Sequence, residues 1–340
     1  MGRNGLGRRR VTPTVMRSFR PGPRTVPFAL ATALALGIPS ACAGGAAVPE
    51  GAPPAVEFIA PDSLAARWAS ALASPARRGA GVTWIGWSVE HPGSGVVMSN
   101  TGPPDLRRGP AGSIADRIGV PRAVARERVG FLFALRPGTN GPQGIVATRI
   151  RRLDAPVDLG DAPVVWLGEA EDSESVALLE SVFPRIRSRQ IQTELGPMVA
   201  VHREPDVSLP ALRRILMGAW PEEVRAEAVA WIGWLLPDAR AVRLVAESLR
   251  HDPSLLVLDE ALTMIDEAGG SPALMTALLD RLASDPEPGA RAMIAEALGA
   301  VRDPRAEAAL RAAASGDPSH LVRDEARDAL EEAAERRGDR

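Results

Sequence analysis

The chain has 340 residues, 45% of them hydrophobic and 24% charged, and its formal net charge is −2. All 40 basic residues are arginines, so a Walker-type phosphate loop, which requires a lysine, is excluded. Residues 220–337 hold 13 arginines against 23 acids. This acidic balance disfavours nucleic-acid binding, because that function needs a basic stripe that displaces counterions from phosphates.

The first 42 residues have the organisation of an export signal. Seven arginines and no acid precede Cys42, an apolar run covers residues 27–38, and small residues follow it. That run is about a dozen residues long, shorter than the roughly 20 that a membrane-spanning helix needs. Met16 begins a more ordinary basic leader and is our candidate for the true start. Removal of residues 1–42 would leave a mature chain with a net charge of about −9.

Cys42, the only cysteine of the chain, allows two interpretations. Residues 38–42 resemble a bacterial lipobox, in which the cysteine is lipidated and becomes the new N-terminus, although Pro39 stands where that pattern prefers leucine. Alternatively, residues 41–43 are an ordinary cleavage site of the small-x-small type, and the cysteine is discarded. In both cases the mature protein has no disulfide. Residues 43–57, rich in alanine, glycine and proline, are typical of a flexible tether.

Residues 58–171 are expected to form a domain of one helix and a small sheet. Ser63 can cap a helix that begins with Leu64. Alternating apolar residues then predict four strands, at residues 82–89, 129–135, 146–151 and 164–167. We expect an antiparallel sheet with one face covered by the helix. Trp84 and Trp87 lie on opposite faces of the first strand, which predicts that at least one of them is partly exposed.

A long connection, residues 91–126, separates the first two predicted strands. It is rich in glycine and proline, and only residues 113–117 have the pattern of a short helix. A connection of this length is either functional or disordered. We expect disorder.

Residues 172–337 are expected to be entirely helical. Pairs ending in proline recur at Pro221, Pro253, Pro286 and Pro318, at intervals of 32, 33 and 32 residues, and each precedes a segment rich in alanine and leucine. Such a period is typical of stacked helical hairpins. The predicted fold class is therefore α+β: a small, antiparallel sheet with helices, followed by an all-α solenoid.

The first helices of two hairpins share a pattern: residues 221–233 and 286–299 each carry an arginine, then small residues, and end in glycine. With this pattern the first helices resemble the HEAT-like repeats of phycobilisome-lyase-type proteins. The second repeat departs from the pattern, with Leu258 where the arginine is expected. The resemblance covers about residues 205–335. It implies a curved surface that binds other proteins; a minority of such proteins act on bilins or modified bases, but no catalytic residue of theirs can be transferred to this chain.

The sequence offers no catalytic, cofactor-binding or metal-binding constellation. The four histidines, His91, His202, His251 and His320, are scattered singly, without a second ligand at metal spacing, and are interpreted as turn or surface residues. The adjacent acids Asp259 and Glu260 point apart on a helix and are interpreted as a solvated face.

The second helices of the hairpins are expected to carry the interaction surface. Their helical phase directs six side chains away from the core: Arg240, Arg243, Glu247, Thr276, Asp280 and Arg305. The sequence therefore predicts a protein-binding scaffold of a bacterial envelope, exported to the periplasm or exposed on a lipid anchor, with membrane contact only through Cys42. The alternative is an enzyme whose site lies in the sheet domain, with the solenoid as its docking arm.

Overall fold

The computed structural model describes residues 56–58, 62–74, 81–91, 99–101, 112–202, 204–233, 235, 238–265 and 271–338. The predicted export signal, Cys42 and most of the tether lie outside these ranges. Within them, no helix has both the length and the apolar character that crossing a membrane requires.

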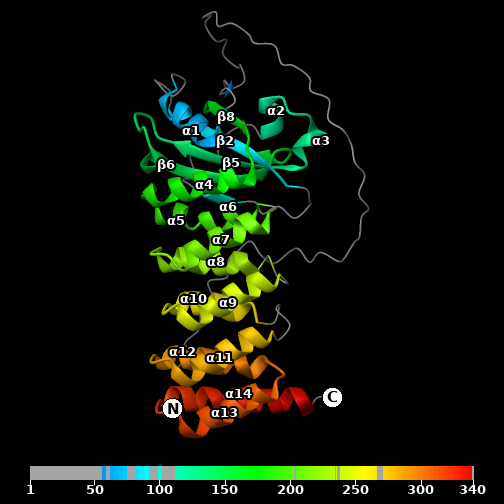
Figure 1. The fold of residues 1–340 in the computed structure, drawn as a ribbon, viewed down its shortest axis with the longest axis vertical. Helices are drawn as coiled ribbons and strands as arrows, with labels where there is room; N and C mark the ends of the chain where they lie inside the picture. The colour runs from blue at the N-terminus through cyan, green and yellow to red at the C-terminus, as the bar shows by residue number, and fades with distance from the viewer. Residues whose placement is uncertain are drawn as a thin grey trace, which may run out of the picture. The chain divides into compact units, whose positions relative to one another are not determined.

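Six strands form one mixed sheet, in the order β1-β8-β2-β5-β6-β3 (Figure 1). They are β1 (Val56–Phe58), β2 (Thr83–Glu90), β3 (Ser99–Thr101), β5 (Arg128–Leu135), β6 (Ile145–Arg152) and β8 (Val164–Glu169). All four predicted strands are present, and the α+β class is confirmed. Strands β2, β5, β6 and β3 pair antiparallel, whereas β8 runs parallel to both β1 and β2. The sheet is therefore mixed rather than antiparallel throughout.

Both faces of the sheet are covered, which corrects the expectation of a single covered face. Helix α1 (Leu64–Ala73) and the later helices cover the face that carries Trp87, whereas Trp84 on the opposite face belongs to a second hydrophobic cluster. Because each face has its own apolar cover, both tryptophans are buried, at 0% exposure for Trp84 and 1% for Trp87. The expected partial exposure of one of them is wrong.

The second cluster is built from part of the predicted connection between β2 and β5. Residues 112–126 contain β4 (Gly112–Ser113), α2 (Ile114–Ile118) and α3 (Arg122–Ala125), and β4 pairs with β7 (Pro156–Val157). The short helix expected at 113–117 is confirmed. Ile114 and Ala125 are buried against the sheet, so the expectation of disorder is wrong for this part. Residues 92–98 and 102–111 lie outside the described residues.

Every regular element from Asp172 to Gly338 in the described ranges is helical. These elements are α4 (Asp172–Val182), η4 (Phe183–Arg185), α5 (Arg189–Gln192), α6 (Leu195–Ala200), α7 (Pro205–Leu216), α8 (Glu222–Gly233), α9 (Ala239–His251), α10 (Leu255–Thr263), α11 (Pro272–Ser284), α12 (Pro288–Ala300), α13 (Pro304–Gly316) and α14 (His320–Gly338); a short turn, η3 (Pro142–Gly144), precedes β6. Proline at the first turn of α11, α12 and α13 loses no helical hydrogen bond there.

The helices stack in two layers (Figure 1). The first layer holds α6, α8, α10, α12 and α14, each packed on the next, and the second layer holds α4, α7, α9, α11 and α13. Small residues allow this close stacking: a Cβ atom at Gly299 of α12 would lie 2.8 Å from the Cβ atom of Ala329 in α14. The predicted hairpin stack, an α-solenoid, is confirmed. One hydrophobic core runs from the Trp87 face of the sheet to Ala329.

Candidate interaction surface on the second helices

Buried ion pairs join successive hairpins at the aspartates of the Asp-Pro pairs. Arg225 of α8 donates two hydrogen bonds to the carboxylate of Asp252, at 2.7 and 2.9 Å, and a third to the carbonyl oxygen of Trp220. Arg291 of α12 binds Asp317 in the same way, with both bonds at 2.8 Å. These hydrogen bonds raise the pKa of Arg291 and lower the pKa of Asp317. The arginine of the first helix therefore fixes the start of the next hairpin.

The second repeat forms this joint with a different residue. Leu258 occupies the position 33 residues after Arg225 and is buried. The aspartate of this boundary, Asp285, is instead bound by Arg281 of α11, whose Nε lies 2.6 Å from Oδ2 of the carboxylate. Arg281 Nη1 also donates to the carbonyl oxygen of Leu249 near the end of α9, at 2.8 Å. The second helix thus supplies the cation that the first helix lacks.

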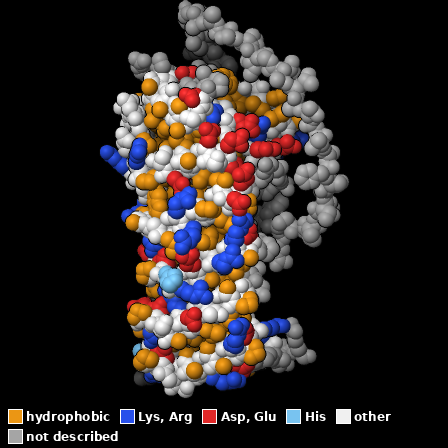
Figure 2. Space-filling model, viewed as in Figure 1, with side chains coloured by type: hydrophobic (Ala, Val, Ile, Leu, Met, Phe, Trp, Pro, Cys, Tyr) orange, Lys and Arg blue, Asp and Glu red, His pale blue; other side chains and the backbone are white. Residues whose placement is uncertain are grey.

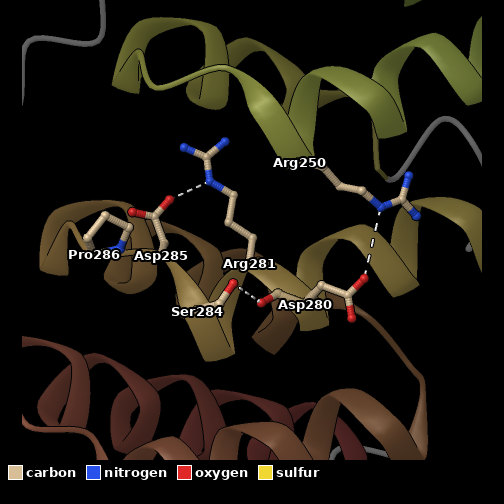
Figure 3. Close-up of a pocket in the computed structure, with 6 residues that line it drawn as sticks. All are labelled: Arg250, Asp280, Arg281, Ser284, Asp285 and Pro286. Carbon is tan, nitrogen blue, oxygen red and sulfur yellow. Dashed lines mark hydrogen bonds and ion pairs between the residues drawn. The ribbon is translucent and has the colours of Figure 1, made fainter.

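A pocket of about 290 Å³ lies beside this substituted joint, between α9 and α11 (Figure 3). Its lining consists of Arg250, Asp280, Arg281, Ser284, Asp285 and Pro286. The pocket is therefore polar, with two guanidinium groups and two carboxylates in its wall.

Only some of the groups that line the pocket form short hydrogen bonds within the chain. Asp285 accepts from Arg281 and, through Oδ1, from the backbone N–H of Glu287 at 2.8 Å. Arg250 and Asp280, by contrast, approach only to 3.9 Å, and the two hydrogen bonds that Arg250 makes to carbonyl oxygens are both 3.5 Å long. Contacts at such lengths are weak. Arg250 and Asp280 are thus the side chains of the pocket that can bind a ligand without breaking a short hydrogen bond.

The six predicted surface residues lie on α9, α11 and α13. Arg240, Arg243, Thr276, Asp280 and Arg305 are exposed, and Glu247 is half-buried. Most of them bind neighbours in the chain: Arg240 binds Asp206 and Asp238, Glu247 binds Arg213, Arg305 binds Asp303, and Thr276 donates to the carbonyl oxygen of Pro272. Among the described residues, Arg243 has no ion-pair partner.

Ion pairs between successive second helices were missed by the sequence interpretation. Arg213 binds Glu247, and Arg214 of the same helix binds Glu180 of α4, in each case through two guanidinium nitrogens. The two residues of each pair are 34 positions apart, as are Arg240 and Asp206. Opposite charges at about the repeat period were a usable signal. Figure 2 shows arginine and acidic side chains interleaved over the helical part of the molecule.

The first layer carries acids at the same period. Glu194, Glu227 and Glu260 follow one another at intervals of 33 residues. Burial raises the pKa of Glu227 to about 6, with repulsion from Glu260 and Glu194 as further causes, although a hydrogen bond from Trp231 opposes the shift. Burial also raises the pKa of Glu260, followed by repulsion from Asp259. Glu260 is half-buried rather than fully solvated, which corrects the sequence interpretation.

The histidines divide into two kinds. His251 and His320 are exposed, as expected, whereas His202 is buried and stacks on Phe131 of β5, with ring centroids 5.3 Å apart. His91 Nδ1 lies 2.8 Å from the carbonyl oxygen of Val201, beside His202. His202 therefore lies in the turn that follows α6, as expected, but it is buried rather than on the surface. No group of His, Cys, Asp and Glu within the described ranges could hold a metal ion.

Comparison with known proteins identifies the repeats. Residues 260–331 match the family of HEAT repeats. Human deoxyhypusine hydroxylase, solved in complex with glycerol, is similar over 48% of this chain and 85% of that chain, with 18% identity and a TM-score of 0.21. A likeness at that score supports no inference about function. No curated protein matches the sequence.

Proposed function

We propose that this chain is a protein-binding scaffold that engages its partner through the second helices. One observation carries the proposal: one side of a continuous core is lined by successive second helices, α7, α9, α11 and α13. These helices present polar, exposed side chains on that side. HEAT repeats, matched over residues 260–331, commonly mediate protein interactions and support this reading.

The dimensions of the stack suit a protein partner. Packed helices lie about 10 Å apart, so four successive second helices span on the order of 40 Å. A standard protein interface buries roughly 800 Å² on each partner. The side of the second layer can therefore hold one complete interface. The acidic balance of residues 220–337 disfavours nucleic acid as the partner.

The proposal is tested by site-specific photo-crosslinking in the native cells. A benzophenone amino acid replaces Thr276, which is exposed on α11 and forms no ion pair, or Asp259, which is exposed on α10 of the first layer. We expect one discrete protein adduct from position 276 and none from position 259. Adducts of the same protein from both positions, or none from position 276, would contradict binding through the second helices.

We also propose export, with Cys42 as a lipid anchor. The support is the order of features in the sequence: seven arginines, an apolar run of about a dozen residues, and small residues up to the only cysteine. Labelled palmitate should enter the wild-type chain and be lost in Cys42→Ala. Label that survives the substitution excludes the anchor, and an unlabelled, processed wild-type chain indicates ordinary cleavage.

A further inference from the structure

The charges on α9 are not balanced as they are elsewhere on the second layer. Its outward stripe consists of Arg240, Arg243, Glu247 and Arg250, spaced as one helical face. Arg240 is neutralised by Asp206 and Asp238, and Glu247 is neutralised by Arg213. Two cations remain: Arg243, which has no ion-pair partner in the described part of the chain, and Arg250, held only by contacts of 3.5 Å or more.

From this imbalance we infer that α9 and the pocket beside it bind an acidic segment of the partner, with one carboxylate on Arg250 in the pocket and a second on Arg243. The inference rests on the proposed function and names the chemistry of the partner at that surface. A chain whose overall balance is acidic would repel such a segment elsewhere, so the two arginines, which have no acid within hydrogen-bonding distance in the described part of the chain, make the site selective.

The wall of the pocket favours a carboxylate over a cation. Arg281 is only 7% exposed and fixed by two hydrogen bonds, so its guanidinium remains a positive wall. Its counter-ion Asp285 already accepts two hydrogen bonds and offers little to a ligand. Asp280 is the opposing charge, but its side chain is 63% exposed and screened by water. A carboxylate that meets Arg250 at hydrogen-bonding distance therefore replaces a weak contact with a charge-assisted one.

The spacing of the two arginines sets the spacing of the acids. Arg243 and Arg250 are seven residues apart on one helix, which corresponds to about 10.5 Å along its axis. A solvated peptide in the polyproline II conformation rises about 3.1 Å per residue and has three residues per turn, so side chains three positions apart lie on the same side. Two acids separated by two residues, an acid-x-x-acid pattern, are then about 9 Å apart on one side of the peptide and match the two guanidinium groups.

This pair of cations occurs in one repeat alone. Thirty-three residues before Arg243 and Arg250 stand Pro210 and Met217, and thirty-three residues after them stand Thr276 and Ala283. The next repeat along the chain is the one whose joint uses Arg281 in place of the first-helix arginine. The site is thus a feature of this boundary and not of the repeat in general.

The test measures fluorescence anisotropy of a labelled glycine-serine peptide that carries Glu-x-x-Glu, with the full chain in 50 mM salt. The matched peptide has glutamine in place of both glutamates. We expect saturable binding of the acidic peptide only, at least tenfold weaker binding to the double variant Arg243→Gln and Arg250→Gln, and a smaller loss for each single variant. Arg327→Gln, which removes an exposed arginine of α14 in the first layer that is paired with Asp324, should change the affinity less than twofold.

Two results would overturn the inference: equal binding of the acidic and glutamine peptides, or equal binding by the wild type and the double variant. Both changed residues are exposed, so the variants are expected to fold, and circular dichroism checks this. Failure here is distinct from failure of the scaffold. If the peptide does not bind while position 276 still captures a partner in cells, the second-helix surface stands and only the acidic chemistry is wrong.

Discussion

Two kinds of joint hold the stack together, and they use different chemistry. Where the sheet meets the first helices, the contact is aromatic: Phe133 stacks on Trp87 at 5.3 Å and meets Phe183 edge-on at 6.1 Å. Where one hairpin meets the next, small residues pack closely and a buried pair such as Arg291 and Asp317 fixes the start of the next hairpin. The first joint gains its stability from burial of large rings, and the second gains its geometry from directional bonds.

The difference explains why only the second kind of joint repeats. A hydrogen-bonded pair at a fixed place in each hairpin can be copied at every boundary, because it needs one arginine, one aspartate and small neighbours. An aromatic cluster fits one particular sheet. Variation of the copied joint, as at Leu258 and Arg281, changes the surface beside it without altering the stack.

The largest effect is expected from Phe133→Ala at the aromatic joint. The side chain is fully buried and touches Trp68, Trp87 and Phe183, so its removal leaves a cavity that rigid rings cannot fill. We expect a loss of about 4 kcal/mol in the free energy of unfolding. Hydrogen exchange should accelerate in both the sheet and α4.

Leu132→Ala provides the control on the same strand, because Leu132 faces the second cluster on the opposite side of the sheet. Leu132→Ala should weaken the sheet. The amides of α4 should nevertheless stay better protected from hydrogen exchange than they are in the Phe133 variant. Equal protection of α4 in both variants would show that the aromatic cluster does not join the sheet to the helices.

A smaller effect is expected from Arg291→Ala at a joint between hairpins. Asp317, only 8% exposed, would lose both guanidinium bonds, and breaking such a buried pair costs about 3 kcal/mol. In a stack, each unit contacts only its neighbours, so exchange should accelerate in α12 to α14 and not in the sheet. Arg281→Ala removes one bond to Asp285 and one to the carbonyl oxygen of Leu249, one fewer than Arg291 makes, and should cost less, about 2 kcal/mol.

Arg305→Ala is the matched surface change, because its pair with Asp303 is at the surface and should contribute little to the free energy of unfolding. If Arg291→Ala costs no more than Arg305→Ala, the buried pairs do not secure the hairpins. Accelerated exchange throughout the sheet of the Arg291 variant would contradict nearest-neighbour coupling.

The sequence predicted the stack well because its signals are local. Prolines at the helix starts and alanines within them mark each hairpin at a constant interval. The parallel pairing of β8 with β1 and β2 could not be read in this way, since it depends on residues far apart in the chain. The sequence indicated the short helix α2 but not the ordered segment after it, because α3 has only four residues, too few to show a period.

The candidate surface was predictable in exposure but not in bonding. Helical phase placed Arg243 and Asp280 on the solvent side, because phase follows from sequence alone. The partners come from other helices, and which arginine reaches which carboxylate depends on the stacking. Arg281 is the clearest case. Leu258 showed that the expected first-helix arginine was missing, but the sequence did not show that Arg281 binds the aspartate of that joint instead.

A still smaller effect, of opposite sign, is expected from Glu227→Gln in the first layer. The folded pKa of Glu227, about 6, lies above its ordinary value of 4.5, so the folded state binds more protons between these pH values. Stability is therefore lost as pH rises through this window, and at pH 7 the charged carboxylate costs about 1 to 2 kcal/mol. The variant should be more stable than the wild type at pH 7 by that amount and equal to it near pH 4.5.

Asp259→Asn is the control for the Glu227 variant, because Asp259 is exposed on the neighbouring helix and its substitution should change stability by less than about 0.5 kcal/mol. Thermal unfolding at the two pH values distinguishes the cases. A Glu227 variant that is less stable than the wild type at pH 7 would mean that its hydrogen bond with Trp231 outweighs the cost of burial.

The smallest effect is expected at the aromatic joint itself, from the titration of His202. Burial lowers the pKa of this imidazole below 6.5, and Asp172 nearby opposes the shift while His91 adds to it. The unfolded state therefore binds more protons below pH 6.5, so the stability is complete above that pH and falls as the solution is acidified.

His202→Phe keeps a ring against Phe131 and removes the titration. The drop in melting temperature between pH 7.5 and 5.5 should be smaller in His202→Phe than in the wild type, whereas His251→Phe, at an exposed position on α9, should leave the drop unchanged. Since acid weakens the aromatic joint and neutralises the buried carboxylate of Glu227, the two regions should respond to pH in opposite directions. Equal drops in the wild type and His202→Phe would show that the buried imidazole does not set the acid response of the joint.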